Sequence, residues 1–346
     1  MNIVKVKSPT NIALIKYWGK YQDYENLHIP TKSSISFTVA KLFTETKLQI
    51  EEGNFAISFT LNGKKIMPIE EKFDYVKEFF YKIQSHYGFT KNYSYQIESK
   101  NNFPVAAGFA SSASGFSALA VAFAKAMEKL GNLKRLDDRK LSVLARLGSG
   151  SATRSIPSKG GLVIWHRGWD NEKSEDKVSK LSFAETLYKP SHFKDLVVIY
   201  VKVEAGEKKV KSRAGMKESV KTVKDYWKWV DYEEKKLLPD MLNAIKFRKW
   251  IELFDMVKRA SDSFHSICLK TNPPIRYLND TSQEIIESIK PLEYAAYTFD
   301  AGPNAVVFAL KNKADEVTDI LKNIVGKDNL VITKVGEGPK YEFVGD

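Results

Sequence analysis

Alternating hydrophobic and polar positions predict strands over the first sixty residues. Residues 3–7 alternate, and residues 33–39 and 44–51 are rich in β-branched and aromatic side chains, which predicts that these two runs form a hairpin. Residues 55–61 predict a further strand that turns at Asn62-Gly63, a dipeptide that favours tight hairpin turns. The chain therefore begins as a β-rich region.

Hydrophobic residues then recur at helical spacing, first over residues 72–87, where the pattern ends near Gly88. The same spacing predicts helices at residues 113–130, 139–147, 216–230, 237–244, 248–270, 282–289 and 314–324. Short hydrophobic runs predict strands at residues 93–99, 161–165, 196–203, 295–299 and 305–310, before a last strand pair.

A length of 346 residues suggests two domains. The polar, charged segment 171–185 is the candidate linker, so we predict an N-terminal domain at 1–185 and a C-terminal domain at 186–346. A hydrophobic content of 43% with 28% charged residues is typical of a soluble globular protein. Cys268 is the single cysteine, and neither a signal sequence nor a transmembrane run is visible, so we expect a cytoplasmic location.

A net charge of +12 raises the question of nucleic-acid binding. The lysines are spread over helical segments and form no aromatic-interleaved block, so we predict neither a nucleic-acid nor a membrane partner. A basic protein that serves a polyanionic small substrate explains the charge equally well. The five histidines show no metal-binding spacing, so no metal site is predicted from them.

Residues 101–120 carry the clearest functional signal. A tight turn of small residues leads into an alanine-rich helical pattern, with hydroxyls at Ser111, Ser112 and Ser114. Small residues let a ligand approach the backbone, and the N–H groups at a helix start favour an anion. The segment predicts a phosphate cradle, with an ordinary helix N-terminus as the alternative. It has neither the Walker lysine nor the dinucleotide glycine spacing.

Four further polar clusters are each ambiguous alone. Residues 16–20 place two lysines around two aromatics, which also suits a half-buried strand with lysines reaching solvent. Residues 148–155 combine four hydroxyls with an arginine, which suits a polyoxyanion but also a plain loop. Residues 208–213 form a dense cation run, commonly a solvated surface. Asp300 follows a predicted strand on a Gly-Pro turn, where an aspartate either caps the backbone or serves as a base.

The joint order of these clusters resembles the mevalonate diphosphate decarboxylase family of the GHMP kinase superfamily. The resemblance runs from Asn11 to Ala305 and includes Ser263-Phe264-His265 and Pro273-Pro274. The motifs that carry it are Asn-Ile-Ala-x-x-Lys-Tyr-Trp-Gly-Lys, Asn-Asn-Phe-Pro-x-Ala-Ala-Gly-x-Ala-Ser-Ser-Ala, Gly-Ser-Gly-Ser-Ala-x-Arg-Ser, Ser-Arg-x-Gly-Met and Phe-Asp-Ala-Gly-Pro-Asn-Ala.

The resemblance implies an α+β GHMP kinase fold, with an N-terminal domain like domain 2 of ribosomal protein S5 and a ferredoxin-like C-terminal domain. It also implies a site in the cleft between them and, by analogy, a homodimer. By the family pattern the catalytic group is Asp300, Lys16 and Arg154. The implied substrate-binding residues are Tyr17, Lys20, Ser149, Ser151 and Arg213. The implied nucleotide-phosphate residues are Ser99, Asn101, Gly108, Ala110, Ser111 and Ser112.

The implied reaction agrees with elementary chemistry. A 3-hydroxy acid without a carbonyl electron sink loses carbon dioxide only if its 3-oxygen becomes a good leaving group, and phosphate is one. Positive charge that stabilises the departing phosphate promotes the step, and Arg154 can orient the carboxylate. A non-catalytic GHMP-fold regulator is a remote alternative, which the intact Lys16, Arg154 and Asp300 argue against.

The chain departs from the family pattern at four positions. Lys32 replaces a common Asn, Val105 a Thr, Phe109 a Leu and Lys211 a Pro. These changes add two cations, Lys32 and Lys211, which we assign to the substrate. They favour a mevalonate 3,5-bisphosphate decarboxylase that gives isopentenyl phosphate and requires no cofactor.

The alternative is the ATP-dependent diphosphomevalonate decarboxylase, which gives isopentenyl diphosphate with ATP and Mg²⁺. The retained Asp300, Ser111 and Ser112 favour this second branch. In either case the implied partner is a small phosphorylated substrate in isoprenoid biosynthesis.

Overall fold

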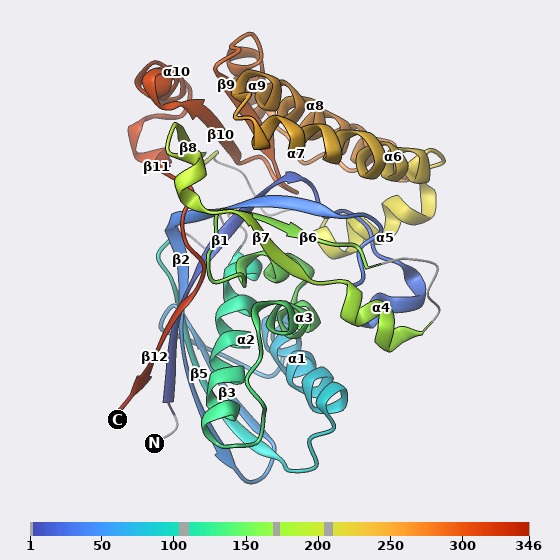
Figure 1. Ribbon diagram of the computed structural model, residues 1–346, viewed down its shortest axis with the longest axis vertical. Helices are drawn as coiled ribbons and strands as arrows, with labels where there is room; N and C mark the ends of the chain where they lie inside the picture. Colours follow the sequence, from blue (N-terminus) through green and yellow to red (C-terminus); the bar gives the residue numbers. More distant parts are fainter. Residues whose placement is uncertain (1–2, 104–110, 169–173, 204–209, 346) are drawn as a thin grey trace.

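Two β-sheets, each accompanied by helices, make up the part of the chain that this computed structural model describes, namely residues 3–103, 111–168, 174–203 and 210–345 (Figure 1). The first sheet has the strand order β12-β1-β2-β5-β3-β4, with β6 and β7 continuing from β2. Its strands are β1 (Ile3–Ile15), β2 (Ser34–Glu52), β3 (Ala56–Leu61), β4 (Lys64–Ile66), β5 (Tyr93–Asn101), β6 (Leu162–Trp165), β7 (Ala184–Tyr188) and β12 (Lys340–Val344).

The predicted hairpin between residues 33–39 and 44–51 is wrong, because both runs belong to the single strand β2. No Gly, Pro, Asn or Asp interrupts residues 40–43, so nothing there favours a turn. The predicted turn at Asn62-Gly63 is confirmed. Both residues have positive φ, 52° and 79°, and they join β3 to its antiparallel partner β4.

The helices associated with the first sheet are α1 (Glu71–Tyr87), α2 (Ser111–Lys129), α3 (Asp138–Gly148) and α4 (Glu175–Leu181). Helix α2 packs against β1 and β2, and its buried alanines permit a close approach to the sheet. Short 3₁₀ segments lie at η1 (Gln22–Leu27) and η3 (Gly150–Ser155). The linker predicted at 171–185 is wrong from Glu175 onward, because α4 and β7 are ordered there and Val178 is buried.

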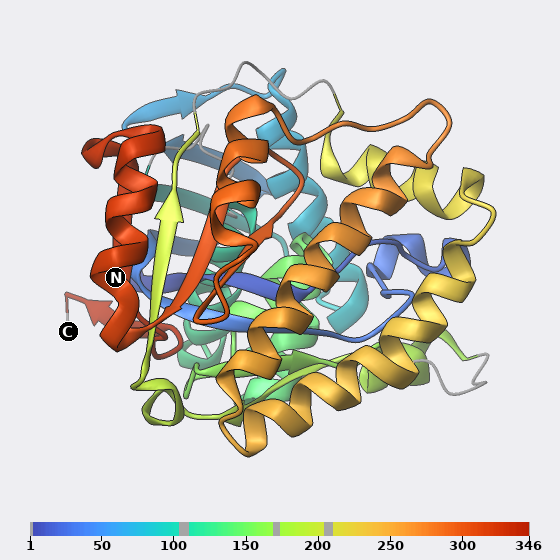
Figure 2. The ribbon, with the colours of Figure 1, turned by 90° about the horizontal axis from the view of Figure 1, so that it is seen from above.

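The second sheet is antiparallel, with the strand order β11-β8-β10-β9. Its strands are β8 (Leu196–Val201), β9 (Ala295–Phe299), β10 (Ala305–Leu310) and β11 (Leu330–Thr333). Helices connect β8 to β9 and β10 to β11, which gives the β-α-β-β-α-β pattern of a ferredoxin-like domain. Figure 2 shows the long helix α8 (Trp250–Leu269) crossing this half of the molecule.

The connection from β8 to β9 contains a run of helices. They are α5 (Ser212–Thr222), α6 (Tyr226–Tyr232), the π-helical turn η5 (Glu233–Leu237), α7 (Leu238–Lys246), α8 and α9 (Asp280–Ile289), while α10 (Ala314–Val325) precedes β11. The helix predicted at 216–230 is therefore split, because residues 223–225 separate α5 from α6.

The last two strands do not pair with each other. β11 pairs with β8, whereas β12 returns to the first sheet and pairs with β1 from Ile3 opposite Val344. Both chain ends consequently lie at the same end of the molecule (Figure 1). The domain boundary at residue 185 stays a prediction. It falls inside β7, and β12 belongs to the sheet formed mainly by the first half of the chain.

Candidate active site

A buried lysine and a partly exposed aspartate meet where strands from the two sheets end. Lys16 follows β1 and Asp300 follows β9, and Lys16 Nζ lies 2.7 Å from Asp300 Oδ1. The Lys16 side chain is 4% exposed, whereas that of Asp300 is 38% exposed. Burial lowers the pKa of Lys16, and the Asp300 carboxylate opposes that effect. The pair thus presents an accessible carboxylate backed by a buried cation.

Arg154 is buried in η3 and is held from two sides. Its Nη1 donates to Ser34 Oγ at 2.7 Å, and its Nε donates to Asn11 Oδ1 at 3.3 Å. Asn11 is fixed in turn, because its amide donates to the Ser151 carbonyl and to Ser155 Oγ. Burial lowers the pKa of Arg154 to about 10, still far above neutrality. Arg154 is therefore a fixed cation, and Asn11, which the sequence reasoning did not single out, positions it.

Tyr17 covers the hydroxyl-rich segment. A side chain at Gly150 would meet the Tyr17 ring at 2.6 Å, so glycine permits this contact. The Tyr17 hydroxyl is buried and has no hydrogen-bond partner among the described residues. Ser149 Oγ and Ser151 Oγ lie 3.1 Å apart beside it. The structure thus brings together Tyr17, Ser149 and Ser151 next to Arg154. The buried Tyr17 hydroxyl is left without an acceptor among the described residues.

A cavity of about 170 Å³ lies near this group and is lined by four cations and one carboxylate, that of Glu78, which lies 2.6 Å from Lys82 Nζ and 3.9 Å from Arg213 Nη1, so the cations outnumber it. Lys20 and Arg213, both predicted from the sequence, line it together with Lys82 and Lys217, which were not. Arg213 also donates to the Gly148 carbonyl at 3.1 Å, which ties the cavity to the start of the hydroxyl segment. Lys82 lies on α1, and Lys217 lies one turn after Arg213 on α5. That i, i+4 spacing was the available signal for Lys217.

A second cavity, of about 240 Å³, lies at the N-terminus of α2. Four predicted nucleotide residues line it, namely Ser99, Asn101, Ser111 and Ser112. Thr44 links this wall to the helix, because its hydroxyl lies 2.6 Å from Asn101 Oδ1 and 2.7 Å from Ser114 Oγ. The remaining wall is largely apolar and includes Phe59, Leu61, Val76 and Ile97. Gly108 and Ala110, like Val105 and Phe109, lie outside the described residues.

The structure does not place Lys32 and Lys211 as free cations. The Lys32 ammonium lies 2.5 Å from Glu233 Oε2, and both side chains are 1% exposed. Lys32 also donates to the Lys16 carbonyl. Lys211 is exposed and pairs with Glu71 at the start of α1. Because a carboxylate already neutralises each lysine, the reason for assigning them to extra substrate phosphate is removed.

His265 is a buried residue near the site. The motif Ser263-Phe264-His265 alone did not indicate a role for it. It lies on α8, is 7% exposed, and its Nε2 has no hydrogen-bond partner among the described residues. Burial lowers its pKa to about 3, with the Lys16 charge adding to the effect. The side chain is therefore neutral at physiological pH.

The neutral state of His265 predicts acid sensitivity. A histidine whose pKa is lower in the folded than in the unfolded state contributes full stability above about pH 6.5 and loses it as pH falls toward its folded pKa of about 3. In the wild type, we expect His265 to account for about 2 kcal/mol of the unfolding free energy that is lost between pH 7 and pH 5. The variant His265→Gln should not show this part of the loss. Urea unfolding of both proteins at the two pH values measures this, and equal losses would contradict it.

Two kinds of feature are absent from the described residues. No group of three or more His, Cys, Asp or Glu side chains that could hold a metal ion occurs among them. Within the same ranges, none of the helices has the length and hydropathy needed to cross a membrane.

Family models match both halves of the chain. The model described as the diphosphomevalonate decarboxylase-like N-terminal domain matches residues 8–176, and that of the mevalonate 5-diphosphate decarboxylase C-terminal domain matches residues 197–338. A diphosphomevalonate decarboxylase from Debaryomyces hansenii is 34% identical over 336 residues, covering 92% of this chain and 82% of the relative. One from Danio rerio is 32% identical over 337 residues, covering 93% and 80%.

Solved structures of high similarity carry the same name. The mevalonate diphosphate decarboxylase of Staphylococcus aureus superposes with a TM-score of 0.86 at 31% identity, covering 98% of each chain. That of Enterococcus faecalis superposes with a TM-score of 0.84 at 31% identity, covering 99% of each. A structure described as MDDEF in complex with MVAPP, AMPPCP and magnesium gives 0.86 at 32% identity, again with 99% of each chain covered.

These likenesses confirm the expected α+β GHMP kinase fold, because they extend over nearly the whole of each chain. They also confirm the family resemblance, which both domain models and relatives above 30% identity carry independently. The chain belongs to the diphosphomevalonate decarboxylase family and is a carboxy-lyase that acts on a phosphorylated mevalonate.

Proposed function

We propose that this protein is an ATP-dependent diphosphomevalonate decarboxylase, the alternative rather than the favoured branch of the sequence interpretation. The observation that carries the proposal is the pairing of Lys32 with Glu233 and of Lys211 with Glu71. The bisphosphate interpretation needed both lysines as free cations. The relatives and structures described above, all of them diphosphate enzymes, support the same choice.

The Lys16–Asp300 pair supports a substrate with a free 3-hydroxyl. A carboxylate can accept the proton of a hydroxyl, whereas a 3-phosphate would bring two negative charges beside Asp300. In the proposed reaction the 3-oxygen attacks the γ-phosphorus of ATP and gives its proton to Asp300, while the bond between the γ-phosphorus and the β-phosphate oxygen breaks and ADP leaves. Lys16, fixed by Asp300 and by the Ala13 carbonyl at 2.9 Å, supplies positive charge beside the reacting oxygen.

Arg154 acts in the second half of the proposed reaction. Its fixed guanidinium holds the substrate carboxylate while the C3–O bond breaks and its electron pair leaves with phosphate. The electrons of the C1–C2 bond then form the C2–C3 double bond, and carbon dioxide departs. Tyr17, Ser149 and Ser151 bind the substrate beside Arg154, and the cavity around Lys20 and Arg213 suits its 5-diphosphate.

The cavity at the start of α2 suits the nucleotide. Its apolar wall can take a purine ring, and its serine hydroxyls lie at a helix N-terminus whose first turn carries no acidic residue. The described residues form no cluster of three or more His, Cys, Asp or Glu side chains for a divalent cation, so Mg²⁺ would be held mainly by the phosphates, with the hydroxyls of Ser111 and Ser112 as donors that line this cavity. The ion would supply positive charge to the transferred phosphoryl group. A homodimer stays a prediction.

One assay separates the two branches. Purified protein is given mevalonate 5-diphosphate with and without Mg-ATP, or mevalonate 3,5-bisphosphate alone, and carbon dioxide release is measured with ADP and phosphate. We expect equimolar carbon dioxide, ADP and phosphate with Mg-ATP only. Nucleotide-free release from the bisphosphate would overturn the proposal.

The variant Lys211→Ala tests the choice between the two branches by changing the protein and keeping the substrate. Because Lys211 forms an exposed pair with Glu71, its removal should change the KM for mevalonate 5-diphosphate by less than about twofold. Arg213→Ala, two residues along, should raise that KM at least tenfold, because Arg213 lines the cationic cavity. A comparable increase in both variants would indicate that Lys211 binds the substrate.

A further inference from the structure

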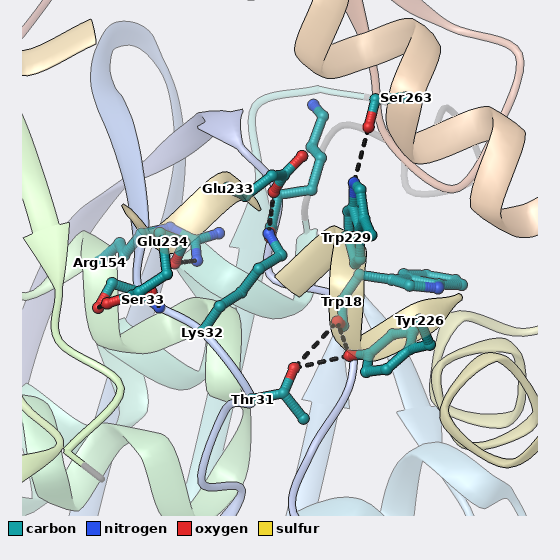
Figure 3. A network of polar contacts seen from close by, with 12 residues as sticks. Trp18, Thr31, Lys32, Ser33, Arg154, Tyr226, Trp229, Glu233, Glu234 and Ser263 are labelled. Carbon is teal, nitrogen blue, oxygen red and sulfur yellow. Dashed lines mark hydrogen bonds and ion pairs between the residues drawn. The ribbon is translucent and has the colours of Figure 1, made fainter. Parts of the chain in front are cut away.

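The segment that carries Lys16 has no regular secondary structure after β1 ends, yet its backbone is tightly held. Two of its carbonyls accept hydrogen bonds from side chains. Lys32 donates to the Lys16 carbonyl. The Tyr226 hydroxyl donates to the Trp18 carbonyl at 2.7 Å (Figure 3). Gly19 makes the second contact possible, since a side chain there would meet the Tyr226 hydroxyl at 1.7 Å. The backbone around Lys16 is thus fixed from outside its own strand.

The Lys32 contact depends on a buried carboxylate. Glu233 is the first residue of the π-helical turn η5, and its carboxylate faces the Lys32 ammonium (Figure 3). Trp229 covers the same ammonium, with its ring centroid 4.5 Å away, and is itself held by Ser263 at 2.7 Å. A buried ammonium without a counter-ion is costly, and the Glu233 carboxylate supplies that counter-ion for Lys32.

The next residue in the π-helical turn holds the other side of the site. Glu234 accepts hydrogen bonds from the Ser33 amide at 2.6 Å and from Ser33 Oγ at 2.8 Å (Figure 3). Ser33 precedes Ser34, whose hydroxyl accepts the Arg154 bond. Two adjacent carboxylates in the connection between β8 and β9 are therefore linked to two predicted catalytic residues. Glu233 is linked through Lys32 to Lys16. Glu234 is linked through Ser33, the neighbour of Ser34, to Arg154.

The extra residue of a π-helical turn explains how adjacent carboxylates can both face the segment 32–33. Successive residues of an α-helix point about 100° apart, whereas a π-type widening changes the local direction, and such turns occur frequently at functional sites. The neighbouring charges Asp231 and Lys235 form an ordinary exposed pair at 2.6 Å. Of these neighbouring charged residues, Glu233 and Glu234 therefore face the site, whereas Asp231 and Lys235 pair with each other at the surface.

We infer that Glu233 and Glu234 are positioning residues for the decarboxylation, Glu233 acting through Lys32 on the Lys16 backbone and Glu234 acting through Ser33 on the support of Arg154. This inference rests on the proposed function for its catalytic consequence. Its structural part, the contacts of the π-helical turn with Lys32 and Ser33, does not depend on any substrate.

The first test replaces the buried pair by apolar side chains of similar length. Replacing a buried ion pair by hydrophobic residues is often neutral or stabilising, which offsets the cost of leaving the Lys16 carbonyl without its donor, so Lys32→Met/Glu233→Met should unfold near the wild-type urea midpoint. The double variant nevertheless loses the donor to the Lys16 carbonyl. We expect kcat to fall at least tenfold while the KM for mevalonate 5-diphosphate changes less than threefold. A wild-type kcat would overturn the Glu233 part.

The second test removes the Ser33 contacts. Glu234→Ala should increase amide hydrogen exchange in peptides that cover residues 29–35 at least tenfold and lower kcat at least tenfold. Glu234→Gln keeps one acceptor oxygen, so it should restore part of both effects. Asp231→Asn is the matched control, because it removes an exposed carboxylate of the same helix, and it should leave exchange and kcat unchanged. Unchanged exchange in Glu234→Ala, or equal losses in the control, would overturn the Glu234 part.

Failure of the proposed function gives a different result. If the wild type does not convert mevalonate 5-diphosphate with Mg-ATP, that function is wrong, and kcat is then measured on the phosphorylated mevalonate that the wild type does decarboxylate. The hydrogen-exchange comparison needs no substrate and tests the positioning contacts in either case.

Discussion

Asp300→Asn is expected to lower kcat by about a thousandfold while the protein stays folded. A positioned general base contributes about 10²–10⁴ to a rate, and the amide that replaces the carboxylate cannot take up a proton. The amide oxygen can still accept the hydrogen bond that Lys16 now donates to Asp300 at 2.7 Å, so we expect the melting temperature to change by only a few degrees. Steady-state carbon dioxide release and thermal unfolding measure the two effects.

The pH profile of the residual activity adds a second observable. The groups that act on the Lys16 charge include Asp300, which raises its pKa, and Arg154 and Lys32, which lower it together with burial. Removing the Asp300 charge therefore lowers the pKa of Lys16 further. If the reaction needs the charged ammonium, activity falls as pH rises through that pKa, so the alkaline decline of Asp300→Asn should begin at a lower pH than in the wild type.

Asp262→Asn provides the control for a carboxylate outside the site, one that is exposed and hydrogen-bonded. Asp262 lies on α8 and accepts the Tyr297 hydroxyl at 2.9 Å. The same change from a carboxylate to an amide at position 262 should leave kcat within about twofold of the wild-type value. Near-normal turnover in Asp300→Asn, or an equal loss in Asp262→Asn, would show that Asp300 has no special role.

The site was predictable where its chemistry lies in compact motifs. Asp300 follows the predicted strand 295–299, and Lys16 follows the apolar run 11–15, which is the end of β1; strand ends are where loops gather functional groups. Arg154 lies in a short segment whose hydroxyls already suggested an oxyanion. These local patterns do not show which segments come together. The family resemblance implied that Lys16, Arg154 and Asp300, which are distant in sequence, form one site.

The remaining features depend on contacts that no local pattern contains. Glu233 and Glu234 lie in the sequence Glu-Glu-Lys-Lys, which is typical of a solvated helix, yet Glu233 is buried against a lysine 201 residues earlier in the chain. Lys32 and Lys211 were interpreted as added charge because their carboxylate partners could not be seen from the sequence. The return of β12 to β1 pairs the two ends of the chain, which hydrophobic periodicity does not report.

Arg154→Lys is expected to lower kcat at least tenfold even though the charge is kept. Arg154 uses Nη1 for Ser34 and Nε for Asn11, and none of the hydrogen bonds among the described residues uses its Nη2. That nitrogen is therefore left to contact a substrate carboxylate. A lysine has one nitrogen on a flexible stem and cannot keep both supports while also reaching the substrate. Single-turnover measurements should show the loss in the rate of carbon dioxide release.

Arg146→Lys separates this effect from the general cost of altering a buried guanidinium. Arg146 is fully buried, and its nitrogens donate to the carbonyls of Leu27, Ser179 and Ser182. Its replacement should leave carbonyls unsatisfied and lower the unfolding free energy by about 1–3 kcal/mol, with kcat per folded molecule preserved. Arg154→Lys should show a smaller loss of stability, because Arg154 makes two such hydrogen bonds where Arg146 makes four, and a much larger loss of rate. If lysine at position 154 supports the full rate, the argument from guanidinium geometry is wrong and Arg154 contributes charge alone.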